Sequence, residues 1–264
     1  MTETKRPKTL APVHPNAGIE ADYRKRLGAL VAEMNASVLY WVSAAYRATP
    51  PEMAQDASPA EDLRRAFDRL ARRWTDKFAD LAPKLARHFA TAATKRADGA
   101  LAGMLKEAGF TVSFKMTTPV NDVFRATLAE NVALIKSIPA QYLTQVQGAV
   151  MRSVQVGRDL GSLTKEIQQQ YGKTFKRAAF IARSQNNIAT ATITRARQTE
   201  IGVTKAIWLH SGAGKHPRPE HVKASGKTYD VAKGMFLEGV WTWPGREPNC
   251  RCVCRSVIPG LRAE

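Results

Sequence analysis

Apolar residues recur at steps of three and four positions through long stretches of the chain, and this periodicity restricts the fold more than any other feature. Within the stretch 19–48 the series comprises Leu27, Leu30, Val31, Met34, Val38 and Trp41. An α-helix turns once in about 3.6 residues, so a series with these steps lies on one face of a helix. We therefore expect long amphipathic helices that pack through their apolar faces.

Prolines mark positions where we expect these helices to end. Pro83 is predicted to divide the helical region 60–108 into two helices. Pro139 is predicted to end one helix, over 121–138, before another over 140–158. Both predictions rest on the same chemistry, because a proline ring removes a backbone N–H donor and clashes with the preceding helical turn.

Other start and stop signals define the remaining segments before residue 202. Ser58 is expected to cap the helix that follows it, and Ser162 is expected to open another. A further helix is expected over 176–201, with Gly202 as its C-terminal stop. Residues 109–118 are rich in β-branched and aromatic side chains, which predicts a short strand or an extended linker.

After residue 202 the sequence changes to short β-rich segments between loops rich in glycine and proline. The expected strands are 203–209, 240–243 and 251–257. The predicted fold class is α+β and mostly helical, with a helical N-terminal half and helical hairpins followed by a small β-containing C-terminal subdomain. The predicted domains are a flexible arm (1–18), a helical N-terminal region (19–118) and a second domain (119–264), with helices over 119–202 and the β subdomain over 203–258.

The chain carries a large excess of positive charge. Lys and Arg number 40 against 23 Asp and Glu, which gives a net charge of +17. An excess of this size favours a polyanionic partner, either nucleic acid or an acidic surface, through long-range attraction and counterion release.

Several features indicate a soluble cytoplasmic product. No apolar leader follows Met1, and the most hydrophobic window, 27–46, contains Glu33 and Asn35. This window predicts an amphipathic helix rather than a membrane span. Three cysteines cannot form a complete set of disulfides within one chain, which favours a reducing compartment.

The segment 151–199 is the most unbalanced in charge, since Asp159 and Glu166 are its only acids. One interpretation is a phosphate-contacting surface that binds DNA without reading its sequence. The alternatives are a solvated helix face or contact with an acidic protein. The candidate DNA-contacting residues are Lys173, Lys176, Arg177, Arg183, Arg195 and Arg197.

The three cysteines alternate with other residues at Cys250, Cys252 and Cys254. On a β-strand this spacing puts all three thiols on one face. Neighbouring same-face residues are about 6–7 Å apart along a strand, which argues against a disulfide between adjacent cysteines.

Histidines supply the remaining soft ligands, because His216 and His221 lie in a loop that can bring both to one ion. The set His216, His221, Cys250 and Cys252 has the donor types that zinc prefers, although its spacing differs from that of zinc fingers. Structural zinc is the one cofactor that the residues suggest. Two alternatives stay open: thiols packed beneath a sheet, and a nucleophilic cysteine paired with His221.

A series of motifs in the second half has a recognisable order. It comprises Leu134–Pro139, Arg177–Arg183, Arg195-x-Arg197-x-x-Glu200-x-Gly202, Trp208, Arg218-Pro219-Glu-His221, Gly226, Pro244-Gly245 and Asn249-Cys-Arg-Cys252. From about Asn131 to Val257 the chain resembles the phage head morphogenesis family typified by the minor head protein F of phage Mu. We expect Trp208, Arg218, Pro219 and Asn249 to be structural residues of that motif.

The resemblance implies a structural protein of a tailed phage rather than an enzyme. Its implied location is the virion head, with the host cytoplasm as the place of assembly. Its implied partners are the portal protein, the capsid or scaffold, and double-stranded DNA during packaging or ejection; no membrane is implied.

Two other functional hypotheses remain. The first is a zinc-dependent hydrolase or nuclease that uses the His/Cys cluster, with Glu220 or Glu247 as general base. The second is an assembly scaffold that contacts only proteins through its basic face.

Overall fold

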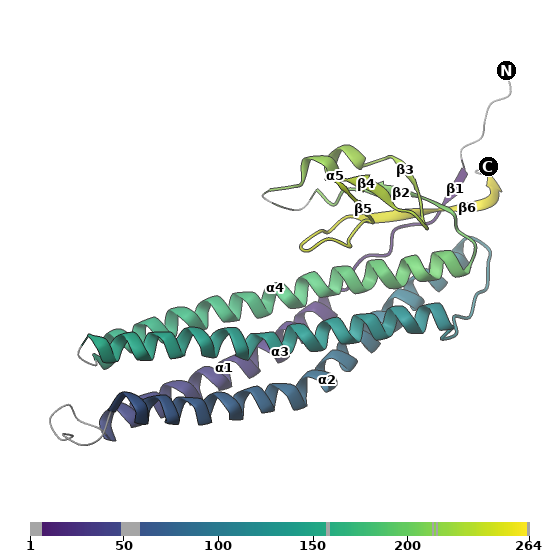
Figure 1. Ribbon diagram of the computed structural model, residues 1–264. Coiled ribbons are helices and arrows are strands. Elements are labelled where there is room, and N and C mark those ends of the chain that lie inside the picture. The colour runs from purple at the N-terminus through teal and green to yellow at the C-terminus, as the bar shows by residue number, and fades with distance from the viewer. Residues whose placement is uncertain (1–6, 49–58, 157–158, 213, 215, 263–264) are drawn as a thin grey trace. The chain divides into compact units, whose positions relative to one another are not determined.

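The computed structural model describes residues 7–48, 59–156, 159–212, 214 and 216–262. The predicted cap Ser58 and the first part of the predicted arm lie outside these residues. Within them the chain is mostly helical with a small antiparallel β region near its C-terminus, which confirms the α+β class. Four long helices make up most of the described chain (Figure 1): α1 (Ala17–Ala48), α2 (Pro59–Glu107), α3 (Thr118–Gln155) and α4 (Leu160–Glu200).

Two of the predicted helix ends are wrong, because α2 continues through Pro83 and α3 continues through Pro139. A proline inside a helix costs about 3 kcal/mol or more through its lost hydrogen bond and its clash. Burial of the side chains around each proline offsets this cost. Ala82 and Ala86 flank Pro83 with no exposed surface, and Ile138, also fully buried, precedes Pro139.

The structure also joins two predicted helices into one. We expected a helix opened by Ser162 and a separate one over 176–201, but α4 runs without interruption from Leu160 to Glu200. Ile167 and Ala178, on either side of the expected break, are each 1% exposed. The buried face is therefore continuous across the Gly172-Lys-Thr174 stretch, and packing keeps the chain helical there.

The chain divides into two compact units, each built from separate stretches of sequence. Unit 1 comprises residues 1–20, 88–128 and 183–264, and unit 2 comprises residues 21–87 and 129–182. Each of the four long helices contributes one part to each unit. Both units take residues from either side of position 118, so they do not coincide with the contiguous domains expected from the sequence.

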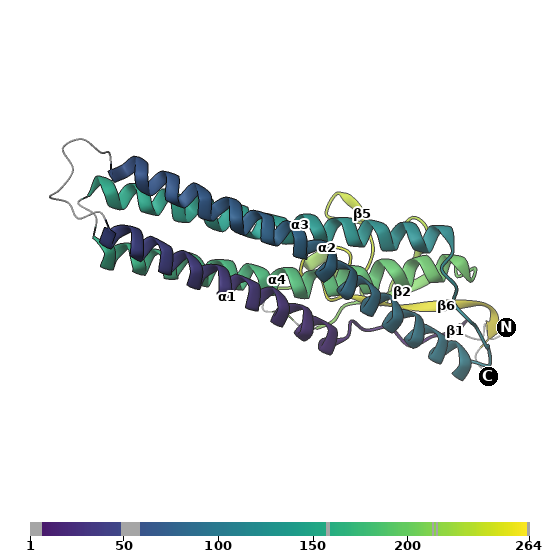
Figure 2. The same cartoon turned by 90° about the horizontal axis from the view of Figure 1, so that it is seen from below.

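Unit 2 is a bundle of segments from α1, α2, α3 and α4, which run side by side (Figure 2). Two buried tyrosine–asparagine pairs join α1 to α3. The hydroxyl of Tyr23 donates to Asn131 Oδ1 at 3.0 Å, and that of Tyr142 donates to Asn35 Oδ1 at 2.8 Å. Burial raises the pKa of both tyrosines above the ordinary value, so both hydroxyls stay protonated and act as donors.

Among the described residues, α1 is the one helix that is long and apolar enough to cross a membrane by length and composition. Its apolar stripe is buried within unit 2 instead, where Leu27, Val31 and Met34 each have no exposed surface. This burial fits the amphipathic helix that the sequence predicts.

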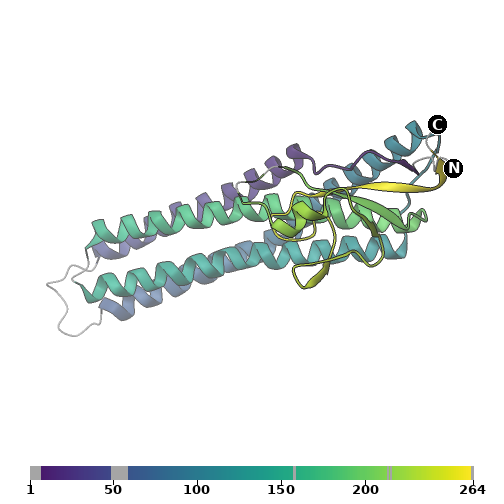
Figure 3. The ribbon, with the colours of Figure 1, turned by 90° about the horizontal axis from the view of Figure 1, so that it is seen from above.

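Unit 1 contains a four-stranded antiparallel sheet in the order β1-β6-β2-β3 and a separate two-stranded pair, β4-β5. The strands are β1 (Pro7–Thr9), β2 (Lys205–Leu209), β3 (Thr228–Asp230), β4 (Met235–Leu237), β5 (Val240–Thr242) and β6 (Val253–Arg262), and the short helix α5 (Pro219–Ala224) lies between β2 and β3 in sequence. The sheet lies over the C-terminal part of α4 (Figure 3). Two contacts confirm this placement: Gln198 Nε2 donates to Ser256 Oγ at 2.8 Å, and Asn187 Nδ2 donates to the Cys250 carbonyl at 2.9 Å.

Comparison with the expected strands gives a mixed result. β2 and β5 fall inside the predicted segments 203–209 and 240–243, and β6 begins two residues later than predicted. Within the predicted arm, which the sequence suggests is extended or disordered, residues 7–9 form the edge strand β1. Residues 110–117 form no strand, so the extended-linker alternative holds for that stretch.

The buried Asn35–Tyr142 pair yields a stability prediction. We expect Asn35→Ala to lower the free energy of unfolding by about 1–3 kcal/mol, because it leaves a buried hydroxyl without an acceptor. Adding Tyr142→Phe should recover part of that loss. Urea unfolding curves measure both changes, with Tyr40→Phe as control, since Tyr40 is 66% exposed. An Asn35→Ala variant as stable as the control would contradict this account.

Candidate metal site and basic residues

Three soft ligand atoms converge in the β region of unit 1. They belong to His221 on α5 and to Cys250 and Cys252, which precede β6. His221 Nδ1 lies 3.5 Å from Cys250 Sγ and 3.8 Å from Cys252 Sγ, and all three ligand atoms lie within 4.8 Å of one another. The three side chains are buried, with exposed fractions of 2%, 4% and 5%.

The Arg218-Pro219 motif positions His221. Pro219 occupies the first turn of α5, where its missing N–H costs nothing because that donor has no helical partner. Arg218, immediately before it, donates from Nη2 to the Pro248 carbonyl at 3.1 Å and pairs with Glu238 at 3.5 Å. Arg218 therefore ties the start of α5 to the loop that leads into Cys250.

Asn249 and Gly245 shape that loop. Asn249 has a φ of 60°, a left-handed conformation that asparagine tolerates better than most residues. Its backbone N–H donates to Ser184 Oγ and its side-chain oxygen accepts from Arg183 Nε, both at 3.2 Å. Gly245 has a φ of 81°, and a Cβ there would lie 3.1 Å from the Cys252 carbonyl oxygen, so a side chain at this position would disturb the cluster.

Trp208 forms one wall of the cluster. It has no exposed surface, and its ring meets the rings of His221 and Tyr229 edge-on, at centroid distances of 5.1 and 6.1 Å. Its indole Nε1 is buried without a hydrogen-bond partner of ordinary geometry. The same N–H is nevertheless close enough to Cys252 to act on it electrostatically, in the direction that lowers the thiol pKa.

The two clustered thiols share a hydrogen bond that makes them unequal. The bond from Cys252 lowers the pKa of Cys250, and backbone N–H groups of Cys252 and Gly245 act in the same direction. The same bond, together with burial, raises the pKa of Cys252 above the ordinary value. Cys250 therefore ionises first, and a second thiolate beside it is unfavourable unless a cation is present.

The geometry suits a tetrahedral zinc ion. Zinc bonds of about 2.3 Å to sulfur and about 2.0–2.1 Å to nitrogen place the two ligand atoms roughly 3.5 Å apart. The two S–N distances, 3.5 and 3.8 Å, are close to that separation. Two thiols and an imidazole are also the donor types that zinc prefers.

Two residues of the cysteine and histidine pattern do not join this group. His216 is exposed and is not among the three residues whose ligand atoms converge. Cys254 lies on β6, where its Sγ accepts from Gln198 Nε2 at 3.3 Å, and burial raises its pKa. All three cysteines are free, and Cys250 and Cys252 precede β6, so strand alternation does not explain why they face His221.

Both acidic residues considered as general bases hold local structure instead. Glu220 accepts a hydrogen bond from the backbone N–H of Glu238. Glu247 Oε1 accepts from Thr242 Oγ1 at 2.8 Å. Neither carboxylate belongs to the group of three converging ligands.

The candidate DNA-contacting residues all lie on α4 but in different surroundings. Lys173 and Lys176 are exposed, in unit 2. Arg177, also in unit 2, donates to Ser137 Oγ at 2.8 Å, and burial lowers its pKa. Arg183 and Arg195 belong to unit 1, where Arg195 lies 4.0 Å from the centre of the Trp243 ring. Lys173 and Lys176 are therefore the members of the set most free to meet a phosphate.

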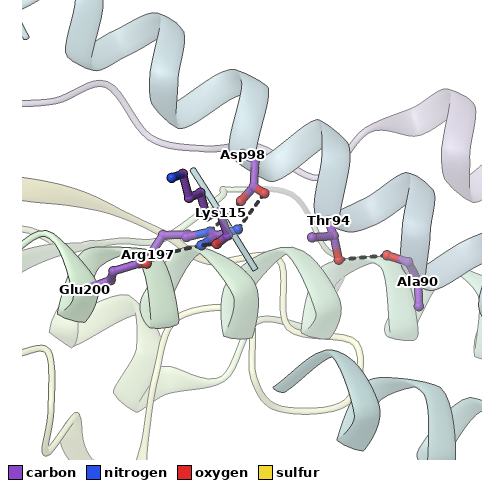
Figure 4. Close-up of polar contacts among 6 residues, drawn as sticks. All are labelled: Ala90, Thr94, Asp98, Lys115, Arg197 and Glu200. Atoms are coloured by element: carbon purple, nitrogen blue, oxygen red, sulfur yellow. Dashed lines mark hydrogen bonds and ion pairs between the residues drawn. The ribbon is translucent and has the colours of Figure 1, made fainter. Parts of the chain in front are cut away.

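Arg197 is buried, at 1% exposed, which corrects its assignment to a DNA-contacting surface. Its guanidinium pairs with both carboxylate oxygens of Asp98 at 2.8 Å and with Glu200 at 2.8 Å (Figure 4). It also donates to the Lys115 carbonyl at 2.6 Å. Burial opposes the charged form, but the two carboxylates outweigh it and raise the pKa of Arg197. This residue is a structural cation.

Comparison with known proteins bears on the same part of the chain. Residues 144–255 match the family described as "Phage Mu protein F like protein". This segment, which is less than half of the chain, is the part that is similar to that family. We call it the Mu F like segment; it contains the three converging ligands and all four predicted motif residues, and it starts after Leu134–Pro139.

A relative in Haemophilus influenzae, named only as an uncharacterized protein, is 36% identical over 139 residues. That similarity covers 53% of this chain and 30% of the relative, so the chain spans less than a third of the relative's length. No solved structure matches the chain.

The Arg197 network yields a second stability prediction. We expect Arg197→Leu to lower the free energy of unfolding by about 3 kcal/mol, because Asp98 and Glu200, whose side chains are 22% and 27% exposed, lose the buried cation that they share. Urea unfolding measures the loss, and Arg64→Leu on an exposed face of α2 should change stability by less than about 0.5 kcal/mol. Equal stability of the two variants would show that the network contributes nothing net.

Proposed function

We propose that this chain is a minor head protein of a tailed bacteriophage that acts in head morphogenesis. The match of residues 144–255 to the Phage Mu protein F like family carries this proposal. The matched segment includes the buried cluster, the Arg218-Pro219 link and the Asn249 turn, so the family pattern falls on residues that shape the fold. In this proposal the protein is a virion component that is assembled in the host cytoplasm.

A structural role also fits the chemistry of the cluster better than catalysis does. The three converging side chains are at most 5% exposed, which leaves little room for a substrate beside them. A hydrolase would need a carboxylate as its general base, and the sequence offered Glu220 and Glu247 for this role. Both accept hydrogen bonds from neighbouring groups instead. The hydrolase or nuclease hypothesis therefore has no base in position.

The proposed partners are the portal protein at the head vertex, the capsid or scaffold, and the packaged double-stranded DNA. The net charge of +17 supports contact with DNA, because neutralising phosphates releases condensed counterions. Lys173 and Lys176, exposed on α4, are the residues that we assign to this contact. No base-reading motif accompanies them, so the binding should not depend on DNA sequence.

DNA contact predicts a steep dependence of affinity on salt. In filter-binding titrations on duplex DNA, the logarithm of the association constant should fall linearly with the logarithm of salt concentration. Lys173→Ala/Lys176→Ala should bind more weakly and reduce the slope by up to about 2, since each lost phosphate contact removes roughly 0.9. Lys223→Ala/Lys227→Ala, which removes the same charge from exposed positions in unit 1, is the matched control. Affinity that is insensitive to salt would exclude DNA contact.

Association with the portal predicts a stable complex in the absence of DNA. Nuclease-treated protein mixed with purified portal protein should co-migrate with it in size-exclusion chromatography. A complex that forms while DNA binding is absent would favour the scaffold hypothesis, in which the basic face meets only acidic proteins. Independent migration of the two proteins would overturn the portal assignment.

A further inference from the structure

The His221–Cys250–Cys252 cluster has no role in DNA contact or in any surface interaction, because all three side chains are buried. We propose that it binds one Zn²⁺ ion whose function is structural. This proposal is independent of the head-protein assignment, which rests on the family match and on charge.

Distances and donor types support the ion first. Three neutral soft groups could pack together without a metal, but their S–N separations of 3.5 and 3.8 Å are those expected around a tetrahedral zinc. Two thiols and one imidazole, all buried, are also the donor set that zinc prefers.

Trp208 supplies a second, separate observation. Its indole N–H is buried without a hydrogen-bond partner of ordinary geometry, and the Cys252 thiol is the weak acceptor that it meets. A protonated thiol is a weak acceptor, whereas a metal-bound thiolate accepts well. With zinc bound, the Cys252 sulfur would satisfy this N–H, and Trp208 would orient the ligand as outer-shell residues commonly do.

The ion would join α5 directly to the backbone of Cys250 and Cys252, just before β6. α5 is only six residues long. Its polar links include Arg218 to Pro248 and Glu238, Glu220 to the Glu238 N–H, and the backbone bonds between Gly226–Lys227 and Trp208, and of these only the Arg218–Pro248 bond reaches the loop before Cys250. A helix of this length has little stability of its own. Zinc would fix α5 to the start of β6 and so hold the loop from Pro244 to Cys250 in place.

Strand register indicates a residue for the fourth position. β2 and β6 pair Trp208 with Cys254 and Leu209 with Val253, so His210, just after β2, continues this register toward Cys252. In the described structure the His210 ring does not lie with the three converging ligand atoms, and it lines a separate cavity with Arg251 and Val253. Its Nδ1 accepts from the Gly212 N–H at 3.1 Å, so Nε2 would bind a metal once the loop after β2 shifts. We assign the fourth position to His210, with this shift accompanying zinc binding, rather than to the exposed His216.

The test uses the intact protein with metal alone. Protein purified under reducing conditions from zinc-supplemented medium should contain about one zinc per chain by elemental analysis. After chelation, Co²⁺ should give an intense sulfur-to-cobalt charge-transfer band and the strong visible bands of a tetrahedral site. Chelation should also lower the unfolding temperature, and added Zn²⁺ should restore it. A zinc content near zero together with no charge-transfer band would overturn the proposal.

Variants assign the ligands. Cys250→Ser and His221→Ala should lose the metal or weaken its binding at least tenfold, and Cys254→Ser, which alters the neighbouring cysteine outside the cluster, should keep it. His210→Ala should weaken Co²⁺ binding and change the visible bands, while His216→Ala should leave both unchanged. If His210→Ala matches the parent protein, the fourth-ligand assignment is wrong. If Cys250→Ser and Cys254→Ser retain the same amount of metal, the metal does not bind at the His221–Cys250–Cys252 cluster.

Discussion

The buried guanidinium of Arg197 is the interaction on which unit 1 depends most. It gathers Asp98 from α2, Glu200 from α4 and the Lys115 carbonyl from the linker before α3 around one charge, and it lies 4.8 Å from the centre of the Phe114 ring. A charge with this little solvent is costly unless every donor is used. Satisfying it forces these three stretches together, which in turn fixes the helical platform beneath the sheet.

This network also shows that the Mu F like segment does not build its own surroundings. Arg197 lies within residues 144–255, but Asp98 and Lys115 lie outside them. The sheet has the same dependence, because its edge strand β1 and the core residues Leu10, Val13, Leu101 and Leu105 precede the segment. The matched segment therefore has different boundaries from the compact unit to which its C-terminal part belongs. Residues of unit 1 outside the match supply contacts that this part of the segment needs in order to fold.

The sequence correctly predicted features that depend on local residue patterns, such as the presence of long helices. It failed for features that depend on contacts with residues far away in the sequence, such as helix ends and the burial of Arg197. Helical periodicity identified the long helices, but Pro83 and Pro139 were misread because the burial that offsets a proline comes from other helices. Ligand chemistry selected His221, Cys250 and Cys252 correctly as neighbours, whereas nothing in the spacing could place the exposed His216. Arg197 was assigned to the surface because its partner Asp98 is 99 residues away; Glu200, three residues later, was the one local sign of an ion pair.

The pairing of β1 with β6 has a consequence for the order in which the protein folds. Thr9 lies opposite Val257, so the first described strand pairs with one that is distant along the chain. Closing so long a loop carries an entropic cost that only later contacts offset, and non-local strand pairing of this kind is slow. The helical segments can associate early, whereas residues 7–9 stay unpaired until β6 has formed. Addition of β1 to the sheet would then be a late event in folding, and it would occur only after the helices and the other strands are in place.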